Sequence, residues 1–252
     1  MKIEIKNRYR NNVIFSHDCP ENTMRITVCS AIKLGSNLSE SDLRDANLRD
    51  ANLRGSDLSG CDLSGSDLRD SDLSGCDLSD SKIIVCDLRG SNLSDSDLRG
   101  INLSDSDLRV CDLSDSKIIG CDLSGCDLSD SKISGSDLRD SDLRGCDLRD
   151  SDLRGCDLRG CDLSDSDLSD SDLSGCDLRG CDLRGCDLRR CNLDRSAWPL
   201  SCGTLHIGSV DVDLARQLAY HFCALPCDDP EFISARNSIM SFANKFKRLR
   251  EC

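Results

Sequence analysis

Aromatic side chains are scarce in this chain and make up only 3 % of its 252 residues. Because Phe, Tyr and Trp dominate ordinary hydrophobic cores, a conventional globular core of this size is not expected. The chain has only three histidines and no C-x-x-C pair, and it lacks a glycine-rich phosphate loop and a nucleophile elbow. We therefore expect no catalytic residues, no cofactor and no metal site, and we predict that the protein is not an enzyme.

Long apolar runs and an excess of basic charge are also missing. No run approaches the roughly 18 apolar residues of a membrane-spanning helix. The first residues, MKIEIKNRYR, lack the apolar core of a signal peptide. We predict a cytoplasmic protein with reduced cysteines and no membrane contact. The formal net charge of −14 disfavours direct nucleic-acid binding and favours a protein partner with a basic surface.

The sequence does contain a repeat of five residues. From Leu38 to Leu193 a leucine or isoleucine occupies every fifth position, 32 times in succession, and we call this position i. Position i−2 is Ser, Cys or Ala except at Ile101, and position i−1 is Asp in 23 units, Asn in six and Lys in three. Position i+1 is mostly Ser or Arg, and position i+2 is mostly Gly or an acid.

A period of five fits neither an α-helix nor a flat strand. On a helix, successive leucines would lie about 140° apart and scatter around the axis. On a strand they would alternate between the two faces. A backbone that turns one corner per unit instead points positions i and i−2 inward, while Gly, Asp and Asn serve the corner. The predicted core includes Leu38, Leu43, Leu48, Leu53, Leu123, Leu128, Leu148 and Leu188.

The units also match a known pattern. Ala46-Asn47-Leu48-Arg49-Asp50 has the form A(D/N)LXX, and residues 36–195 resemble the pentapeptide-repeat family. The resemblance implies a right-handed quadrilateral parallel β-helix with four units per coil, so about eight coils. At roughly 4.8 Å per coil the rod is about 38 Å long. Because the ends of a solenoid expose strand edges, we expect a cap at each end.

Residues 1–35 are the expected N-terminal cap, with an α/β composition. Residues 2–5 and 12–15 are predicted to pair as a short hairpin. Residues 20–34 are predicted as a helix, because Pro20 lies near its start and Gly35 follows its end. Its apolar contacts are expected from Met24, Ile26, Val28, Ile32 and Leu34.

Residues 196–252 are the expected C-terminal helical cap. A strand is predicted over residues 204–210, and helices over 212–225 and 230–249. In the second helix Ile233, Ile239, Phe242, Ala243 and Phe246 recur at spacings of three and four. Two interpretations remain open, a monomer cap or a homodimer contact like the C-terminal element of the family's resistance proteins. The residues assigned to either role are Trp198, Ile239, Phe242 and Phe246.

Thirteen of the 19 cysteines occupy position i−2. Residues 20 apart would stack on one face, as Cys156 and Cys176 would, at a spacing within the disulfide range. Parallel stacked side chains and a reducing compartment favour the other interpretation. In it the cysteines are small buried hydrophobes of the core.

The repeat carries 37 acids and 20 bases, a net charge of −17. This is one net charge per roughly 2.2 Å of rod, compared with about 1.7 Å for duplex DNA. The resemblance to family members of the quinolone-resistance type implies a DNA mimic that binds DNA gyrase or topoisomerase IV. The alternative is a structural scaffold or regulatory protein with an unrelated protein partner. In that case Asp at i−1 serves the corner, although the acids at i+2 stay unexplained because Gly also occurs there.

The faces of the implied rod differ in arginine content. Of the eight units that share a face with Leu48, the Leu48 face, six carry Arg at i+1. We predict that the partner contacts a less arginine-rich face. The residues chosen, on the face that contains Leu43 (the Leu43 face), are Asp122, Asp142, Asp162 and Asp182. Ile84, Val85 and Ile119 are outward apolar residues, interpreted either as a small patch or as packing along the strands.

Overall fold

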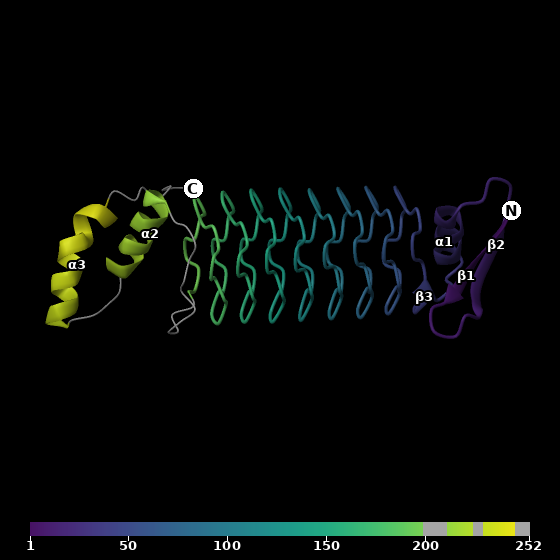
Figure 1. The fold of residues 1–252 in the computed structure, drawn as a ribbon, viewed down its shortest axis with the longest axis horizontal. Helices are drawn as coiled ribbons and strands as arrows, with labels where there is room; N and C mark the ends of the chain where they lie inside the picture. The colour runs from purple at the N-terminus through teal and green to yellow at the C-terminus, as the bar shows by residue number, and fades with distance from the viewer. Residues whose placement is uncertain (199–210, 224–228, 245–252) are drawn as a thin grey trace.

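The computed structural model describes residues 1–198, 211–223 and 229–244, apart from the side chains of residues 213, 214 and 221. Its elements in chain order are β1 (Lys2–Asn7), β2 (Val13–Asp18), α1 (Met24–Lys33), β3 (Ser41–Asp42), α2 (Val212–Cys223) and α3 (Pro230–Ala243). Between β3 and α2 the chain winds as a stack of similar coils that gives the molecule the shape of a rod (Figure 1). No helix in the described ranges is long and apolar enough to cross a membrane.

Each coil of the rod contains 20 residues. Asp42 forms a parallel bridge with Asp62, Asp62 with Lys82, and so on along four ladders of single bridges. The backbone joins neighbouring coils in both directions: Leu43 N donates to Asp62 O at 2.8 Å, and Asp62 N donates to Ser41 O at 3.0 Å. Four five-residue units therefore make one coil, with one unit on each side of the rod.

The corners fall at position i+2. All 32 residues there have positive φ, between 54° and 78°. Gly adopts this left-handed conformation freely, and Asp tolerates it better than most residues. The next amide closes a turn onto the leucine carbonyl, as Ala46 N does to Leu43 O at 3.3 Å. The backbone thus explains why position i+2 is Gly in 15 units and an acid in 13.

The interior is a column of leucines on each side. Every position-i side chain, including the eight leucines predicted for the core, is at most 1 % exposed. Most Ser and Cys side chains at i−2 also point inward and donate to the Leu or Ile carbonyl of the preceding coil. Four serines donate instead to the leucine carbonyl three residues earlier: Ser41, Ser56, Ser71 and Ser91. Ser66 Oγ lies 2.8 Å from Leu43 O, and Cys86 Sγ lies 3.0 Å from Leu63 O. The two residue types are therefore interchangeable, since both fill the same space and satisfy the same carbonyl.

The cysteines at i−2 are buried free thiols. Burial raises the pKa of Cys86 to about 11 and the pKa of Cys146 to about 12. Contact with stacked Cys176 and burial both raise the pKa of Cys156. A protonated thiol that donates to a backbone carbonyl is the core-packing arrangement expected from the sequence.

A hairpin covers the strand edge of the first coil. The sheet order is β2-β1-β3, and Lys6 and Asn7 of β1 pair antiparallel with Asp42 and Ser41. Arg8 N continues this edge by donating to Glu40 O at 2.8 Å. The predicted hairpin is present, and both of its strands are longer than the sequence indicated.

The helix that follows begins later than predicted. Helix α1 starts at Met24, not at residue 20, because Thr23 is its N-cap and accepts a hydrogen bond from Ile26 N at 3.2 Å. Glu21 has a φ of 56° and cannot belong to the helix. Val28 is buried, whereas Leu34, also expected to supply an apolar contact, is 73 % exposed beyond the last turn.

Helices α2 and α3 lie at the other end of the rod (Figure 1). Asp229 caps α3, and the rings of Phe222 and Phe232 lie 4.8 Å apart between the helices. Gln217 is 2 % exposed, and its Oε1 can accept from Leu193 N and Asp194 N at 3.1 and 2.8 Å. This side chain takes the place of a further coil, because Leu193 has no later leucine unit to pair with.

Three of the four residues predicted for the C-terminal cap or dimer contact lie in the described part of the chain. Trp198 packs partly buried against the core, and Ile239 and Phe242 are half-buried. Phe246 and the strand predicted over residues 204–210 lie outside the described residues. The homodimer contact stays a prediction.

Candidate functional site: the aspartate ladders

Position i−1 supplies the outward ladder on each side of the rod. The carboxylate Oδ1 accepts a hydrogen bond from the backbone amide two residues later, as Asp122 does from Ser124 N at 3.1 Å. Asn47 makes the same bond with Arg49 N at 3.2 Å. Such local bonds favour Asp and Asn in turns. Part of the acidity of this chain therefore has a structural origin.

The residue at i+1 decides how much of each carboxylate remains available. In serine units the hydroxyl donates to the same oxygen, as Ser124 Oγ does to Asp122 Oδ1 at 2.7 Å. In arginine units the guanidinium engages both oxygens: Arg69 Nε and Nη2 lie 2.8 and 2.6 Å from Asp67 Oδ1 and Oδ2. This hydrogen bonding holds the pKa of Asp67 below its usual value. Arginine units thus present a paired charge. Serine units present a free charge unless an arginine of the preceding coil lies near the aspartate, as Arg109 does at Asp127.

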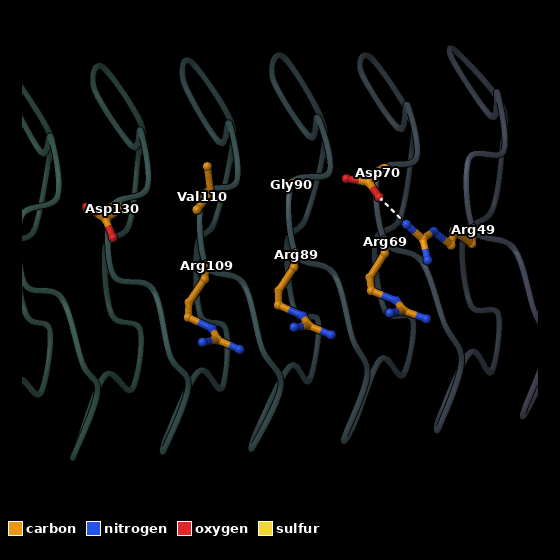
Figure 2. Close-up of a pocket in the computed structure, with 8 residues that line it drawn as sticks. All are labelled: Arg49, Arg69, Asp70, Arg89, Gly90, Arg109, Val110 and Asp130. Carbon is orange, nitrogen blue, oxygen red and sulfur yellow. Dashed lines mark hydrogen bonds and ion pairs between the residues drawn. The ribbon is translucent and has the colours of Figure 1, made fainter.

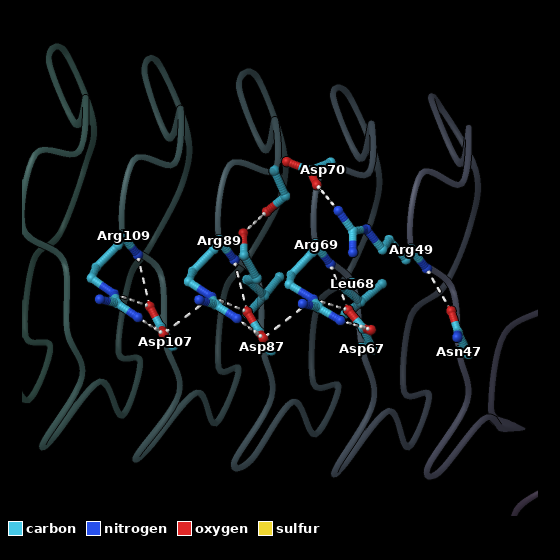
Figure 3. Close-up of polar contacts among 12 residues, drawn as sticks. Asn47, Arg49, Asp67, Leu68, Arg69, Asp70, Asp87, Arg89, Asp107 and Arg109 are labelled. Atoms are coloured by element: carbon cyan, nitrogen blue, oxygen red, sulfur yellow. Dashed lines mark hydrogen bonds and ion pairs between the residues drawn. The ribbon is translucent and has the colours of Figure 1, made fainter.

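On the Leu48 face the pairs between Asp67 and Asp127 join into a zipper, part of which is drawn in Figure 3. Arg69 Nε lies 3.4 Å from Asp87 of the next coil, and Arg89 lies 3.4 Å from Asp107 in the same way. Arg109 extends the chain to Asp127 at 3.4 Å. Each exposed pair contributes little to stability, at most about 1 kcal/mol. The consequence of the zipper is local neutralisation of the face.

Seven ladder aspartates have no arginine or lysine nitrogen within 4.0 Å among the described residues. They are Asp57, Asp62, Asp72, Asp77, Asp112, Asp122 and Asp172. Their Oδ1 atoms accept from the serine or its amide within the unit. Six of the seven lie between Asp57 and Asp122, whereas every ladder aspartate from Asp127 to Asp167 has an arginine nitrogen within 4.0 Å.

The four aspartates predicted to bind a partner form one ladder. Asp122, Asp142, Asp162 and Asp182 are successive bridge partners on the Leu43 face. Arginines at i+1 engage both oxygens of Asp142 and Asp182. Asp162 has an arginine nitrogen 3.8 Å away, and Asp122 has none. The structure thus brings these residues into one line but leaves them unequally compensated.

The Leu43 face and the Leu48 face differ in arginine content but not in net charge. The units of the Leu43 face hold nine acids and four bases, and those of the Leu48 face hold 12 acids and seven bases, so each face sums to −5. The additional corner acids of the Leu48 face offset its additional arginines. Sequence reasoning that counted arginines alone missed this balance.

The corner acids also have a structural reason that the sequence did not reveal. Asp45 Oδ1 lies 2.5 Å from the point that a Cβ on Gly65 would occupy, one coil later. The carboxylate leans across the next corner, and glycine leaves it room. In eight of the 13 cases the residue 20 positions after a corner acid is indeed glycine.

An open groove of about 550 Å³ follows the edge of the Leu48 face (Figure 2). Its lining comprises Arg49, Arg69, Asp70, Arg89, Gly90, Arg109, Val110 and Asp130. Within the described ranges no His, Cys, Asp or Glu side chains gather in a way that would hold a metal ion. The Leu48 face thus offers a charged ladder and, along its edge, a shallow groove.

A sequence model described as "Pentapeptide repeats" matches this chain in eight copies, over residues 41–80, 86–125, 121–160 and 161–196. The comparison with curated proteins finds no match.

Several solved structures are similar. QnrB1, a plasmid-mediated fluoroquinolone resistance protein, is 19 % identical, with 74 % of this chain and 97 % of that chain covered at a TM-score of 0.39. HetL, involved in heterocyst differentiation regulation in the cyanobacterium Nostoc sp. strain PCC 7120, is 23 % identical, with 69 % and 96 % covered at a TM-score of 0.32. Alr5209, a pentapeptide repeat protein from the same organism, is 30 % identical, with 42 % and 84 % covered at a TM-score of 0.35.

Proposed function

Since this chain belongs to the pentapeptide-repeat family, we propose that it is a non-enzymatic acidic rod that acts by binding another protein. The specific form of the proposal is a DNA mimic: the rod occupies the duplex-binding surface of a DNA-processing enzyme such as DNA gyrase or topoisomerase IV. In this proposal the rod is right-handed, contains about eight coils between its two caps, and acts in the cytoplasm.

The observation that carries the proposal is the set of outward carboxylates that no arginine engages. Six of the seven such ladder aspartates lie between Asp57 and Asp122, where neighbouring coils are about 4.8 Å apart along the rod axis, so uncompensated negative charge gathers on that part of the surface. With a net charge of −17 on residues 36–195, the linear charge density approaches that of a duplex. A basic DNA-binding surface would attract such a rod over about a Debye length, about 8 Å at physiological salt.

The ladder chosen from the sequence is the first surface to test. Replacement of Asp122, Asp142, Asp162 and Asp182 by Asn removes four charges, and Asn keeps the turn bond as Asn47 does. If each carboxylate contributes about 0.5 kcal/mol, the variant loses about 2 kcal/mol, or roughly 30-fold in affinity. The matched control carries Asp→Asn at Asp67, Asp87, Asp107 and Asp147, which arginines engage on the Leu48 face.

The assay is gyrase supercoiling across a titration of the purified protein, with and without a quinolone, together with competition against a DNA duplex. Inhibition or protection that weakens with salt and with the Leu43-face variant supports mimicry. Equal effects of the two variants would argue against this choice of face.

One observation favours a second candidate, a scaffold or regulatory protein with an unrelated partner. Both classes of acid have roles in the fold itself: the ladder acids close turns, and the corner acids lean over glycines. Negative charge can therefore accumulate without selection for a basic partner. No effect on gyrase at a large excess of protein would favour this candidate.

A further inference from the structure

Four corners of the rod break the rule that the other 28 follow, and two of the four carry valine. Position i+2 is Gly or an acid everywhere except at Val85, Val110 and the last two units, which carry arginine. Val85 has a φ of 54° and Val110 a φ of 60°. A β-branched residue in this left-handed region is strained. Both side chains are also 63 % exposed, so burial does not compensate for the strain.

The two valines lie at opposite edges of the Leu48 face. Val85 immediately precedes the unit of Arg89, and Val110 ends the unit of Arg109, one coil further along. They are separated by one side of the rod and by one coil, which rises about 4.8 Å along the axis. Figure 2 shows Val110 beside Gly90 in the column that runs from Asp70 to Asp130. The valine window, defined as Val85, Arg89, Gly90, Arg109 and Val110, thus includes the middle of the groove.

The charge of the window differs from that of the surrounding rod. The aspartates inside it, Asp87 and Asp107, are both held by the arginine zipper. The coil of Arg89 has no corner acid at either edge of this face, because Val85 and Gly90 occupy those corners. The coil of Arg109 carries Asp105 at one edge of the face and Val110 at the other. The window is therefore a less acidic and partly apolar part of the rod surface.

The arginines of the window retain unused donors. Arg89 and Arg109 each donate through Nε and Nη2 to the aspartate of their own unit. Their Nη1 groups make no hydrogen bond within the described part of the chain. A carboxylate placed over the window would meet these donors, because guanidinium groups bind carboxylates strongly.

We propose that the valine window docks a segment of a partner protein in which two apolar side chains flank one or more carboxylates. The apolar side chains contact Val85 and Val110, and the carboxylates accept from Nη1 of Arg89 and Arg109. This segment is acidic and apolar, whereas the partner surface proposed for the aspartate ladders is basic. The rod consequently has two independent binding faces.

The test uses a library of short random peptides displayed on phage and selected on the full-length protein. Enriched peptides are then synthesised with a fluorescent label, and their affinity is measured by anisotropy. The variant Val85→Asn/Val110→Asn removes the apolar contacts, and Asn tolerates the left-handed corner. The control Asp150→Asn/Asp165→Asn changes two corners of the same two columns, away from the groove.

We expect enriched peptides that carry acids between apolar residues. The valine variant should bind them about tenfold more weakly or worse, and the control should bind them within about twofold of the parent protein. The melting temperature of the valine variant should equal or exceed that of the parent, because the strain is relieved.

Three results would overturn the proposal. One is the enrichment of basic peptides, or a selection that enriches no peptide. Another is equal peptide binding by the two variants. The third is a parent protein that light scattering shows to be a dimer and that the valine variant makes monomeric, since a second copy would then cover the window.

Discussion

Alkaline pH should unfold this rod through its buried cysteines. Eleven of the 13 thiols at i−2 have a raised pKa, with Cys146 at about 12 as an example. Burial is the main cause for nine of them, whereas for Cys156 and Cys181 contact with a stacked cysteine comes first and burial second. In the unfolded chain a thiol titrates near about 8.5. A raised folded pKa means that the stability is fully present below about pH 8.5 and is lost as the pH rises towards the folded value.

The magnitude follows from the size of this shift. For Cys146, a rise from about pH 7 to about pH 9.5 removes about 1.4 kcal/mol, because only the unfolded thiol releases its proton. Eleven such thiols would together remove about 15 kcal/mol. Even a third of this sum, about 5 kcal/mol, is comparable to the whole stability of many domains.

Urea unfolding followed by circular dichroism, with a reductant present, at both pH values would measure the loss. The variant Cys146→Ser should have nearly the parent stability at neutral pH, because serines elsewhere make the same bond to the leucine carbonyl. It should lose about 1.4 kcal/mol less on going to alkaline pH. A parent protein whose stability is unchanged between the two pH values would refute the reasoning that these thiols stay protonated in the fold.

The same urea assay checks three further predictions. Leu123→Ala should cost about 2–5 kcal/mol, because the side chain is 1 % exposed in mid-rod; a loss below about 1 kcal/mol would contradict a packed core. Gly120→Ala, where a Cβ would have no neighbour within 4 Å, should cost about 1 kcal/mol for the left-handed corner. Gly185→Ala should cost more, because its Cβ would lie 2.2 Å from Asp165 Oδ1, and Asp165→Gly should remove the excess. At acid pH, the arginine hydrogen bonds that lower the pKa of the paired aspartates should keep the melting temperature constant down to about pH 5. Below about pH 4 the melting temperature should decrease, because these aspartates become protonated. A decrease already between about pH 7 and about pH 5 would point to other groups.

The repeat could be predicted from the sequence because its period excludes the regular alternatives. A leucine every fifth residue has no shared face on a helix or a flat strand, so only a turning backbone buries it. The leucines from Leu38 to Leu193 lie inside, as that argument requires. The turn role of Asp at i−1 followed from the known local bonding of Asp side chains.

The start of α1 was missed because two local signals compete. Pro20 is a common first helical residue, but Thr23 can bond to the amide three residues later and fixes the start there. Leu34 was expected inside on apolarity alone, although it lies past the last helical residue. Helix capping therefore sets the start of α1 at Met24 and leaves Leu34 beyond its end.

The compensation of charge could not be read from residue counts. Whether Asp62 or Asp142 presents a free charge depends on the single residue two positions later. The link from Arg69 to Asp87 spans 18 residues and follows only from the 20-residue coil. The strain at Val85 and Val110 likewise required knowledge of which position forms the corner.

The 20-residue coil gives this fold two ways to change its length. A whole added coil would extend every ladder and leave the existing faces in phase. A single added or deleted unit would preserve the leucine interior but rotate all later units by a quarter turn relative to the earlier ones. Arg69 and Asp87, for example, would then lie on different sides of the rod. One small duplication could therefore produce a new arrangement of the outer surface without any amino-acid substitution.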